Sequence, residues 1–319
     1  MSGPTHVPRV AAWESGDVFV GATVLDDPMD DHAGRGRILQ LDAALRPKGV
    51  WMLADTSHLV GGLKFDPRGV LWAFDSQGFA VLNLHRDGRV VRRREFGARA
   101  WSHANFAADG TLLLAEHVVG DAVDPAVQAR MRTRIPFMAG TQRFGDGHVF
   151  RFAADGTPLA EYGTATHGGM GGFLGVTMSV LAPDQRTLIY CSETGPRLLR
   201  YDLAADVQLP DLQSSTPPYP PGSPPMFFAL DHAADGTLWV LRSGALEALD
   251  ETGQTLCQWP LEGFGWALLD CMADGVHALV SNFFTGEIAK ISLIDGRTIA
   301  SYASGAPRAI AGVVEFTGP

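Results

Sequence analysis

The stretch that decides the fold is residues 106–117, FAADGTLLLAEH. Two other segments share its pattern: residues 65–75, FDPRGVLWAFD, and residues 232–242, HAADGTLWVLR. Each has a short apolar run, a tight turn with glycine, and a second run rich in Leu, Val and Trp. Glycine tolerates the positive φ that a tight hairpin turn needs, and the flanking residues suit a pleated surface. The pattern predicts a β-hairpin that recurs along the chain.

The first turn of this unit recurs six times, and a second turn follows each copy. The first turns are Ser15-Gly16, Arg68-Gly69, Asp109-Gly110, Asp184-Gln185, Asp235-Gly236 and Asp274-Gly275. The second turns are Asp87-Gly88, Asp155-Gly156, Thr252-Gly253 and Asp295-Gly296, with weaker equivalents at Leu45–Lys48 and Ala204–Asp206. Four antiparallel strands, A to D, in copies of about 40–50 residues are typical of a β-propeller. We predict an all-β, six-bladed β-propeller with four-stranded antiparallel blades, as one domain over residues 1–319.

The two ends of the chain favour a ring closed between the N- and C-termini. Residues 306–316, APRAIAGVVEF, have the pattern of a strand A with no strand B after it, and Asp17–Thr23 have that of a strand B. A blade shared between the two ends would leave no exposed sheet edge. In the alternative, Val7–Ala12 form the inner strand and the C-terminal segment is an extra edge. The sequence leaves both arrangements open.

Composition disfavours several classes of function. The net charge of −10 disfavours binding to nucleic acid or to an anionic membrane, because both need a positive field. Three cysteines, Cys191, Cys257 and Cys271, do not suit a disulfide framework and fit a reducing compartment. The N-terminus has no apolar signal segment, and no stretch approaches the ~18–20 apolar residues of a membrane span. We expect a cytoplasmic protein with a small-molecule substrate and no nucleic-acid or membrane partner.

Long loops gather on one side of the predicted ring. In a four-stranded blade the A–B and C–D turns share one face, which we call the plain face. The B–C and D–A loops share the other, the decorated face. Insertions 26–36 and 118–147 are B–C loops, and the Pro-rich segment 209–225 is a D–A loop. Because long loops on a rigid scaffold often carry function, we expect the site at the channel mouth of the decorated face.

Polar residues follow strand B of most blades, where that strand reaches the decorated face. Alignment on the turns puts Asp75, Glu116, Ser192, Arg242 and Ser281 at equivalent places, with His117, Glu193 and Asn282 beside them and His103 and His58 near the start of strand A. Such a convergence is typical of a binding or catalytic site. For any single residue, the alternative interpretation is a strand-end polar group that bonds loop backbone.

Two chemistries fit this set. Oxygen ligands from Glu116, Glu193 and Asn282, with Asp75 as a fourth, suit a hard cation such as Ca²⁺. His103 and His117 with Glu116 suit a zinc-like site or acid–base catalysis. Substrate-binding candidates are His58, Asp75, Ser192 and Asn282. No helix follows the Gly-rich segment Gly168–Gly172 to bind phosphate, so we expect no nucleotide cofactor.

The repeat resembles the six-bladed propellers of the gluconolactonase/regucalcin-like and NHL-repeat superfamily. The resemblance rests on residues 182–202, APDQRTLIYCSETGPRLLRYD, residues 232–244, HAADGTLWVLRSG, and residues 281–296, SNFFTGEIAKISLIDG. It implies a divalent metal in the channel, held by Glu and Asn or Asp residues, several of them near the start of strand A. The residues found eight positions before the turn residues are Gly61, Ser102, Thr177, Phe228 and Ala267. None is an acid or Asn, so no family ligand is carried over to this chain.

Two hypotheses on function follow. The first is a small-molecule enzyme, a hydrolase of lactonase or esterase type or a lyase. In it Glu116 and Glu193 hold a metal or the substrate, His103 or His117 moves a proton, Arg242 orients an anionic group, and loop 118–147 acts as a lid. The second is a non-enzymatic propeller that binds a ligand or a protein partner on the decorated face.

Overall fold

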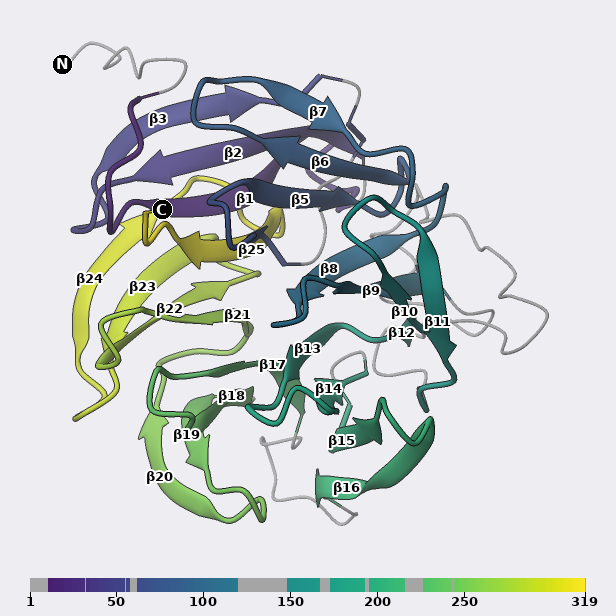
Figure 1. Ribbon diagram of the computed structural model, residues 1–319. Helices are drawn as coiled ribbons and strands as arrows, with labels where there is room; N and C mark the ends of the chain where they lie inside the picture. The colour runs from purple at the N-terminus through teal and green to yellow at the C-terminus, as the bar shows by residue number, and fades with distance from the viewer. Residues whose placement is uncertain are drawn as a thin grey trace, which may run out of the picture.

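The computed structural model describes residues 11–31, 33–54, 56–57, 62–119, 148–166, 173–192, 195–215, 226–242 and 244–318. In this part of the chain, six antiparallel sheets stand around a central channel (Figure 1). All regular elements of the described residues are strands. This part of the chain has no helix that is long and apolar enough to span a membrane. The expected six-bladed β-propeller is confirmed.

Five blades have four strands each, and blade 3 has a fifth. Blade 1 consists of β25 (Ile310–Glu315), β1 (Val18–Leu25), β2 (Gly34–Leu41) and β3 (Pro47–Met52). Blade 2 consists of β4 (Lys64–Phe65), β5 (Leu71–Asp75), β6 (Ala80–Leu84) and β7 (Val90–Arg92). Blade 3 consists of β8 (Trp101–Phe106), β9 (Leu112–Val119), β10 (Val149–Phe152), β11 (Pro158–Tyr162) and the additional β12 (Phe173–Gly175).

The remaining three blades follow the same order. Blade 4 consists of β13 (Met178–Leu181), β14 (Thr187–Cys191), β15 (Arg197–Asp202) and β16 (Val207–Ser214). Blade 5 consists of β17 (Phe227–His232), β18 (Leu238–Arg242), β19 (Ala245–Leu249) and β20 (Thr255–Pro260). Blade 6 consists of β21 (Trp266–Cys271), β22 (His277–Asn282), β23 (Glu287–Ser292) and β24 (Thr298–Ala303).

The turns predicted from glycine are the points where the strands reverse. Each of the six A–B turns has a residue with positive φ: five are glycines and the sixth is Gln185, with φ 56°. Two of the C–D turns likewise have non-glycine residues there, Leu45 and Asp206. In blade 3, the turn is closed by the Gly110 N–H donating to Ala107 O over 3.0 Å. The spacing of turn residues therefore set the strand boundaries.

The first of the two closure arrangements is correct. The C-terminal strand β25 pairs antiparallel with β1, and the register matches Val18 with Glu315 and Val20 with Val313. β25 is thus the inner strand of blade 1. Residues 7–10 of the alternative inner strand lie outside the described residues, and residues 11–12 belong to no strand.

An aromatic cluster packs both chain ends against blade 2. The ring of Phe316 lies 5.3 Å from Trp13 and 5.1 Å from Phe65, and Trp13 lies 4.8 Å from Phe19. The guanidinium of Arg86 lies over the Phe316 ring at 5.1 Å. Phe316 and Trp13 are almost completely buried. Burial of these rings supplies apolar stabilisation where the ring is joined.

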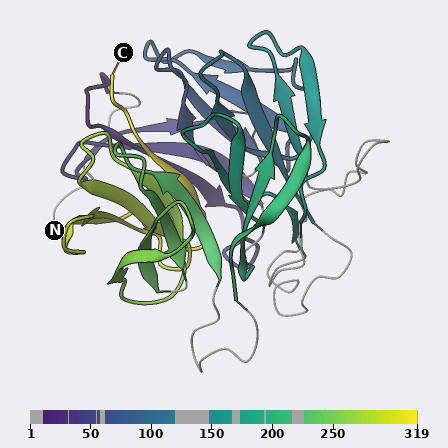
Figure 2. The ribbon, with the colours of Figure 1, turned by 60° about the horizontal axis from the view of Figure 1, so that its bottom comes forward.

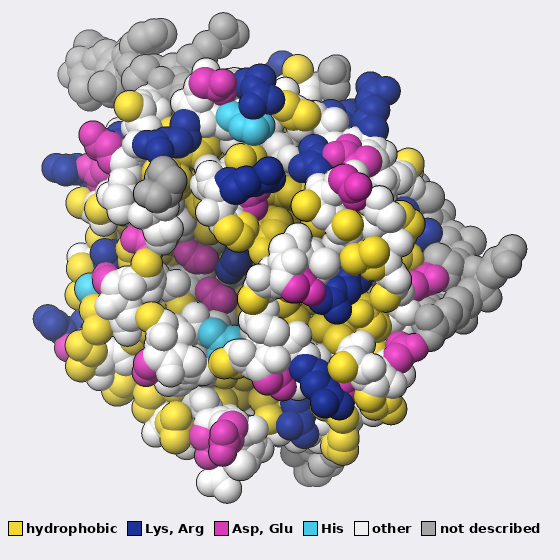
Figure 3. Space-filling view, viewed as in Figure 1, with side chains coloured by type: hydrophobic (Ala, Val, Ile, Leu, Met, Phe, Trp, Pro, Cys, Tyr) yellow, Lys and Arg dark blue, Asp and Glu magenta, His cyan; other side chains and the backbone are white. Residues whose placement is uncertain are grey.

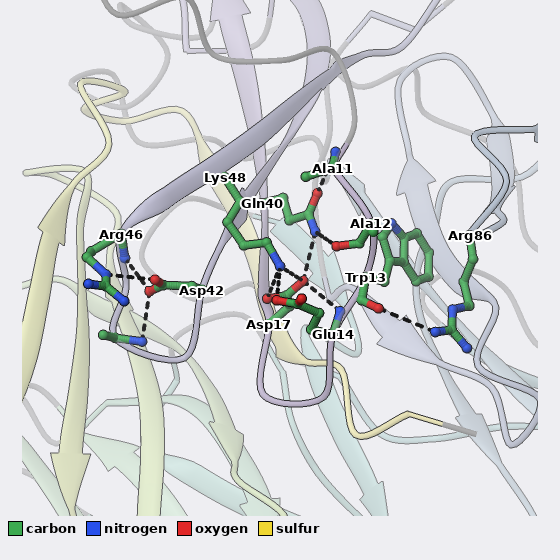
Figure 4. A network of polar contacts seen from close by, with 11 residues as sticks. Ala11, Ala12, Trp13, Glu14, Asp17, Gln40, Asp42, Arg46, Lys48 and Arg86 are labelled. Carbon is green, nitrogen blue, oxygen red and sulfur yellow. Dashed lines mark hydrogen bonds and ion pairs between the residues drawn. The ribbon is translucent and has the colours of Figure 1, made fainter.

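A buried carboxylate fixes the N-terminal segment on blade 1. Asp17 accepts hydrogen bonds from the Glu14 N–H at 3.0 Å and from Gln40 Nε2 at 2.8 Å, and it pairs with Lys48 Nζ at 2.9 Å (Figure 4). Gln40 also bonds the backbone of Ala11 and Ala12. Since Asp17 is 2% exposed, its charge depends on these partners.

The connections that the sequence identified as long all leave the decorated face, but their predicted bounds are partly wrong, because residues 34–36, 118–119 and 209–214 belong to β2, β9 and β16. β1 ends and β2 begins there, as do β9 and β10, and β16 and β17 (Figure 2). Within the predicted insertions, residues 32, 120–147 and 216–225 lie outside the described residues. The tight turns and the C-terminal end of β25 lie on the plain face.

We predict that Phe316→Ala lowers the free energy of unfolding by about 3–5 kcal/mol, the usual cost of truncating a buried aromatic residue. Chemical denaturation of the full chain measures this loss. Ile294→Ala is the matched control, because Ile294 is 70% exposed and its truncation leaves no cavity. Equal stability of the two variants would contradict the role given to Phe316.

Candidate functional site

Glu116 lies at the end of a strand B, as expected, and is engaged by Arg99. Arg99 Nε donates to Glu116 Oε1, and Arg99 Nη2 donates to Oε2 at 2.9 Å. The guanidinium also lies 4.9 Å from the centre of the Phe150 ring. Glu116 is completely buried, so this bidentate pair neutralises a charge that burial would otherwise make costly.

Two other strand-B ends organise loop backbone. Asp75 accepts hydrogen bonds from the N–H groups of Ser57 at 2.6 Å and Gly78 at 2.8 Å. Asn282 Oδ1 accepts from Phe284 and Thr285, and its Nδ2 donates to Phe264 O at 3.0 Å. Both side chains fit the alternative interpretation, in which a strand-end polar group holds the neighbouring loop.

The remaining predicted residues are distributed around the ring. Arg242 lies 3.4 Å from Glu247 within blade 5, with its guanidinium 4.4 Å from the centre of the Phe227 ring. Ser192 is buried directly after β14. His58 and Glu193 lie outside the described residues, as do residues 120–147 of the predicted lid.

His103 is the predicted residue that lines the central channel, on inner strand β8. Its Nδ1 lies 2.9 Å from Ser102 Oγ and its Nε2 lies 2.6 Å from Ser179 Oγ on β13. Asn105 Nδ2 donates to the same Ser179 hydroxyl at 2.8 Å, and Ser102 Oγ donates to backbone carbonyls. These partners assign the ring proton to Nδ1 and leave Nε2 to accept from Ser179.

The ring of His103 is neutral. Burial, with smaller effects from His117 and Lys64, lowers the pKa of His103 to about 3. His117 lies on β9, the strand that pairs with the β8 of His103. A neutral, doubly hydrogen-bonded imidazole is well suited to hold Ser179 and Asn105 in place.

The channel holds a second group of polar side chains, which the sequence analysis did not identify. Lys64 of β4 lies between two aspartates, with Nζ 3.8 Å from Asp231 Oδ1 and 4.0 Å from Asp270 Oδ1. Figure 3 looks onto the ring from the side of Figure 1 and shows acidic and basic side chains gathered in its central hollow. The free volume of the cavity beside these side chains is about 20 Å³. This is room for little more than one water molecule.

Each of these aspartates also links one blade to the next. Asp231 Oδ2, on blade 5, accepts from the Cys271 N–H of blade 6 at 2.8 Å. Asp270 Oδ2, on blade 6, accepts from the Glu315 N–H of blade 1 at 2.8 Å. The second oxygen of each carboxyl faces Lys64. The backbone hydrogen bonds therefore fix the position of each carboxyl, while one oxygen of each remains directed at Lys64 in the channel.

The environment of this group raises the pKa of both Lys64 and Asp270, for different reasons. Asp231 raises the pKa of Lys64 above its ordinary value, against the effect of burial, so the ammonium remains charged. Burial raises the pKa of Asp270 to about 7; Asp231 adds to this rise and Lys64 opposes it. A carboxyl that titrates near neutrality can both hold and release a proton there.

These polar residues of the channel lie nearer the plain face. We expected the site at the channel mouth of the decorated face. Asn105, Asp231 and Asp270 are each the second-last residue of an inner strand, and each inner strand ends at an A–B turn on the plain face. The reason is register: a residue near the end of strand A projects into the channel close to that turn. Strand-B ends instead meet the loops of the decorated face.

A sequence signal for this group exists. Lys64, Asn105, Asp231 and Asp270 each stand five residues before the positive-φ glycine of their A–B turn. Apolar residues fill most of the other inner-strand positions, so a polar residue at this repeated place is informative. The position eight residues before the turn, where the resembling family has metal ligands, carries no such signal in this chain.

The described residues predicted as metal ligands do not fit a metal. Both oxygens of Glu116 are engaged by Arg99, and the Asn282 oxygen accepts two backbone N–H groups. Across the described part of the chain, no group of three or more His, Cys, Asp and Glu side chains could hold a metal ion. We therefore derive no step through a metal.

Comparison with known proteins relates this chain to solved propellers by fold. No protein-family model matches it, and no curated protein matches its sequence. A chain of a nidogen/laminin complex matches with a TM-score of 0.62 at 10% identity, over 94% of this chain and 98% of that one. A streptogramin B lyase matches with a TM-score of 0.52 at 12% identity, over 95% of this chain and 93% of that one. These matches show that the chain shares the propeller fold.

We predict that Asp270→Asn removes a pH dependence of stability. In the wild type, the unfolded aspartate loses its proton near pH 4, whereas the folded one keeps it to about pH 7. The folded state then binds more protons over this window, so this contribution to stability falls as pH rises. The free energy of unfolding of Asp270→Asn should gain about 1–3 kcal/mol on the wild type between pH 5 and pH 8.

Urea denaturation at both pH values tests this. Asp155→Asn is the control, because Asp155 is exposed in a C–D turn and its pKa is lowered, which puts its titration below the window. Parallel pH profiles of wild type and Asp270→Asn would show that Asp270 does not titrate in this range.

Proposed function

We propose that this protein is a small-molecule enzyme of the hydrolase or lyase class that performs acid–base chemistry in its central channel. The observation that carries the proposal is the group of Lys64, Asp231 and Asp270 in the channel, in which the buried carboxyl of Asp270 has a pKa raised to about 7. Perturbed carboxyls beside a fixed cation are more common at functional sites than elsewhere. A streptogramin B lyase has the same fold, so this architecture is compatible with such an activity.

Asp270 would transfer the proton. As the carboxylate, it would take a proton from a water molecule in hydrolysis, or from a carbon in an elimination. It would return that proton to the leaving oxygen or nitrogen as the second bond breaks, so the site ends in its starting protonation state. A pKa near 7 serves both directions.

The other channel residues would position and stabilise. The Lys64 ammonium would stabilise negative charge that develops on the substrate oxygen, since it keeps its proton. His103 would hold Ser179 and Asn105, which places two hydrogen-bonding groups at the same depth of the channel. The sequence-based hypothesis gave proton transfer to His103 or His117. The low pKa of His103 favours Asp270 for this task.

The size of the cavity limits the substrate. About 20 Å³ of free space admits only a small or narrow group to the charged residues. The rest of the substrate would lie at the channel mouth on the plain face, which is the nearer one to Lys64. The Lys64 side chain keeps 38% of its surface exposed. Lactones, esters and small polar molecules with a β leaving group match these conditions.

The test is to measure turnover of a panel of lactones, esters and small polar molecules with a β leaving group by the purified protein. Asp270→Asn should reduce kcat by about 10²–10⁴-fold, the usual worth of a general acid–base group. It should also remove the ionisation near pH 7 from the rate profile. Asp155→Asn should match the wild type. Unchanged turnover in Asp270→Asn, or a rate profile without that ionisation in the wild type, would refute the proposal.

A further inference from the structure

A second cavity opens on the decorated face, between blades 1 and 6. Its volume is about 700 Å³, within the usual range for small-molecule pockets. The end of β1, residues 28–29 of the following loop, and residues 305–309 between β24 and β25 form its walls. Nothing in the proposed channel chemistry uses it.

Part of this cleft is apolar and open to solvent. Phe284 is 41% exposed and Met29 is 55% exposed, and both line it together with Pro28 and Pro307. Large apolar side chains grouped in a concavity are typical of ligand sites, whereas single exposed ones are ordinary surface.

The cleft is also lined by an arginine that forms no ion pair with a carboxylate of the described residues. Arg37 reaches it from β2, and its Nε is buried with no hydrogen-bond partner. Burial lowers the pKa of Arg37, and the group that opposes this is the Tyr302 phenol. No carboxylate in the described ranges forms an ion pair with it. A buried donor without a partner costs free energy, which suggests a function for its position.

A second arginine lines the same cleft. Arg308 has φ 59°, and its N–H donates to Phe283 O at 2.6 Å. A non-glycine residue in this conformation carries strain that its surroundings must offset. The guanidinium lies 5.8 Å from the centre of the Phe284 ring and, like that of Arg37, is paired with no described carboxylate. The cleft therefore combines two arginines, neither paired with a described carboxylate, with an apolar wall in a protein of net charge −10.

The aromatic wall is held in place. Asn282 accepts the Phe284 N–H at 3.0 Å, and the Phe284 ring stacks on Phe264 at 5.6 Å. Gly265 leaves room for that ring, because an added Cβ would lie 2.2 Å from Phe284 Cδ2. The site is thus largely pre-formed, which reduces the entropic cost of binding.

We propose that this cleft binds a small amphipathic anion: an apolar or aromatic body that carries one carboxylate, sulfonate or phosphate group. The anionic group accepts hydrogen bonds from the guanidinium groups of Arg37 and Arg308. The apolar body packs on Phe284 and Met29. Charge-assisted bonds of guanidinium to such groups are among the stronger ones in proteins.

Fluorescence titration with anilinonaphthalene sulfonate tests this on the full chain. Phenylnaphthylamine, which lacks the sulfonate, is the matched ligand control. Arg37→Met and Arg308→Asn should each weaken sulfonate binding by about tenfold or more; Asn tolerates the positive φ at position 308. Arg89→Met, an equal charge change at an exposed turn, should leave affinity unchanged. Benzoate should displace the dye and benzyl alcohol should not.

Three results would overturn the proposal. They are the absence of saturable binding, equal affinity of the sulfonate for wild type and both variants, and binding of the uncharged dye as tight as that of the sulfonate. Loss of binding in a misfolded variant is excluded by unchanged near-ultraviolet circular dichroism.

Stability gives an independent measurement. Because Arg37→Met removes a buried donor that has no partner, the variant should unfold at the same temperature as the wild type or at a higher one. At the same concentration, the sulfonate should raise the unfolding temperature of the wild type more than that of the variant. A variant less stable than the ligand-free wild type would show that Arg37 is structural, and would contradict its assignment to ligand binding.

Discussion

The closed ring depends on one antiparallel strand pair, β25 with β1. It joins residues near opposite ends of the sequence, Val18 with Glu315, and so closes the circle of blades. Its entropic cost is that of closing the whole ring. The buried aromatic contacts of Phe316 and the partners of Asp17 oppose that cost at the same place.

The inner strands add a second constraint, because they are tied to one another around the channel. Gly62 N–H donates to Ser102 O between blades 2 and 3, and Ser179 joins blades 3 and 4. Asp231 and Asp270 make the corresponding links between blades 5 and 6 and between blades 6 and 1. The same carboxyls that we propose for chemistry therefore also hold the ring, and each can do both because its two oxygens have different partners.

The sequence predicted the fold because one local rule is repeated: a residue that tolerates positive φ at each turn. It also predicted that His103 would lie at the channel. It did not predict that Arg99 would form an ion pair with Glu116. Nor did it predict that Asn282 would hydrogen-bond the loop backbone. Both contacts depend on how the loops return to the strands. The aspartates of the channel were missed since their shared position appears only when the inner strands are aligned five residues before the turn. Arg37 and Arg308 are far apart in sequence, and only ring closure brings them to one cleft.

The closure also determines how the molecule responds to mechanical force. The segment before β1 and the segment after β25 both leave the plain face, and Ser15 Oγ donates to Thr317 O at 3.1 Å. Tension applied through these two segments would act on the β25–β1 hydrogen bonds one after another, as in unzipping, rather than on all of them in shear. Such a ring would open from its ends at a lower force than a strand pair loaded in shear.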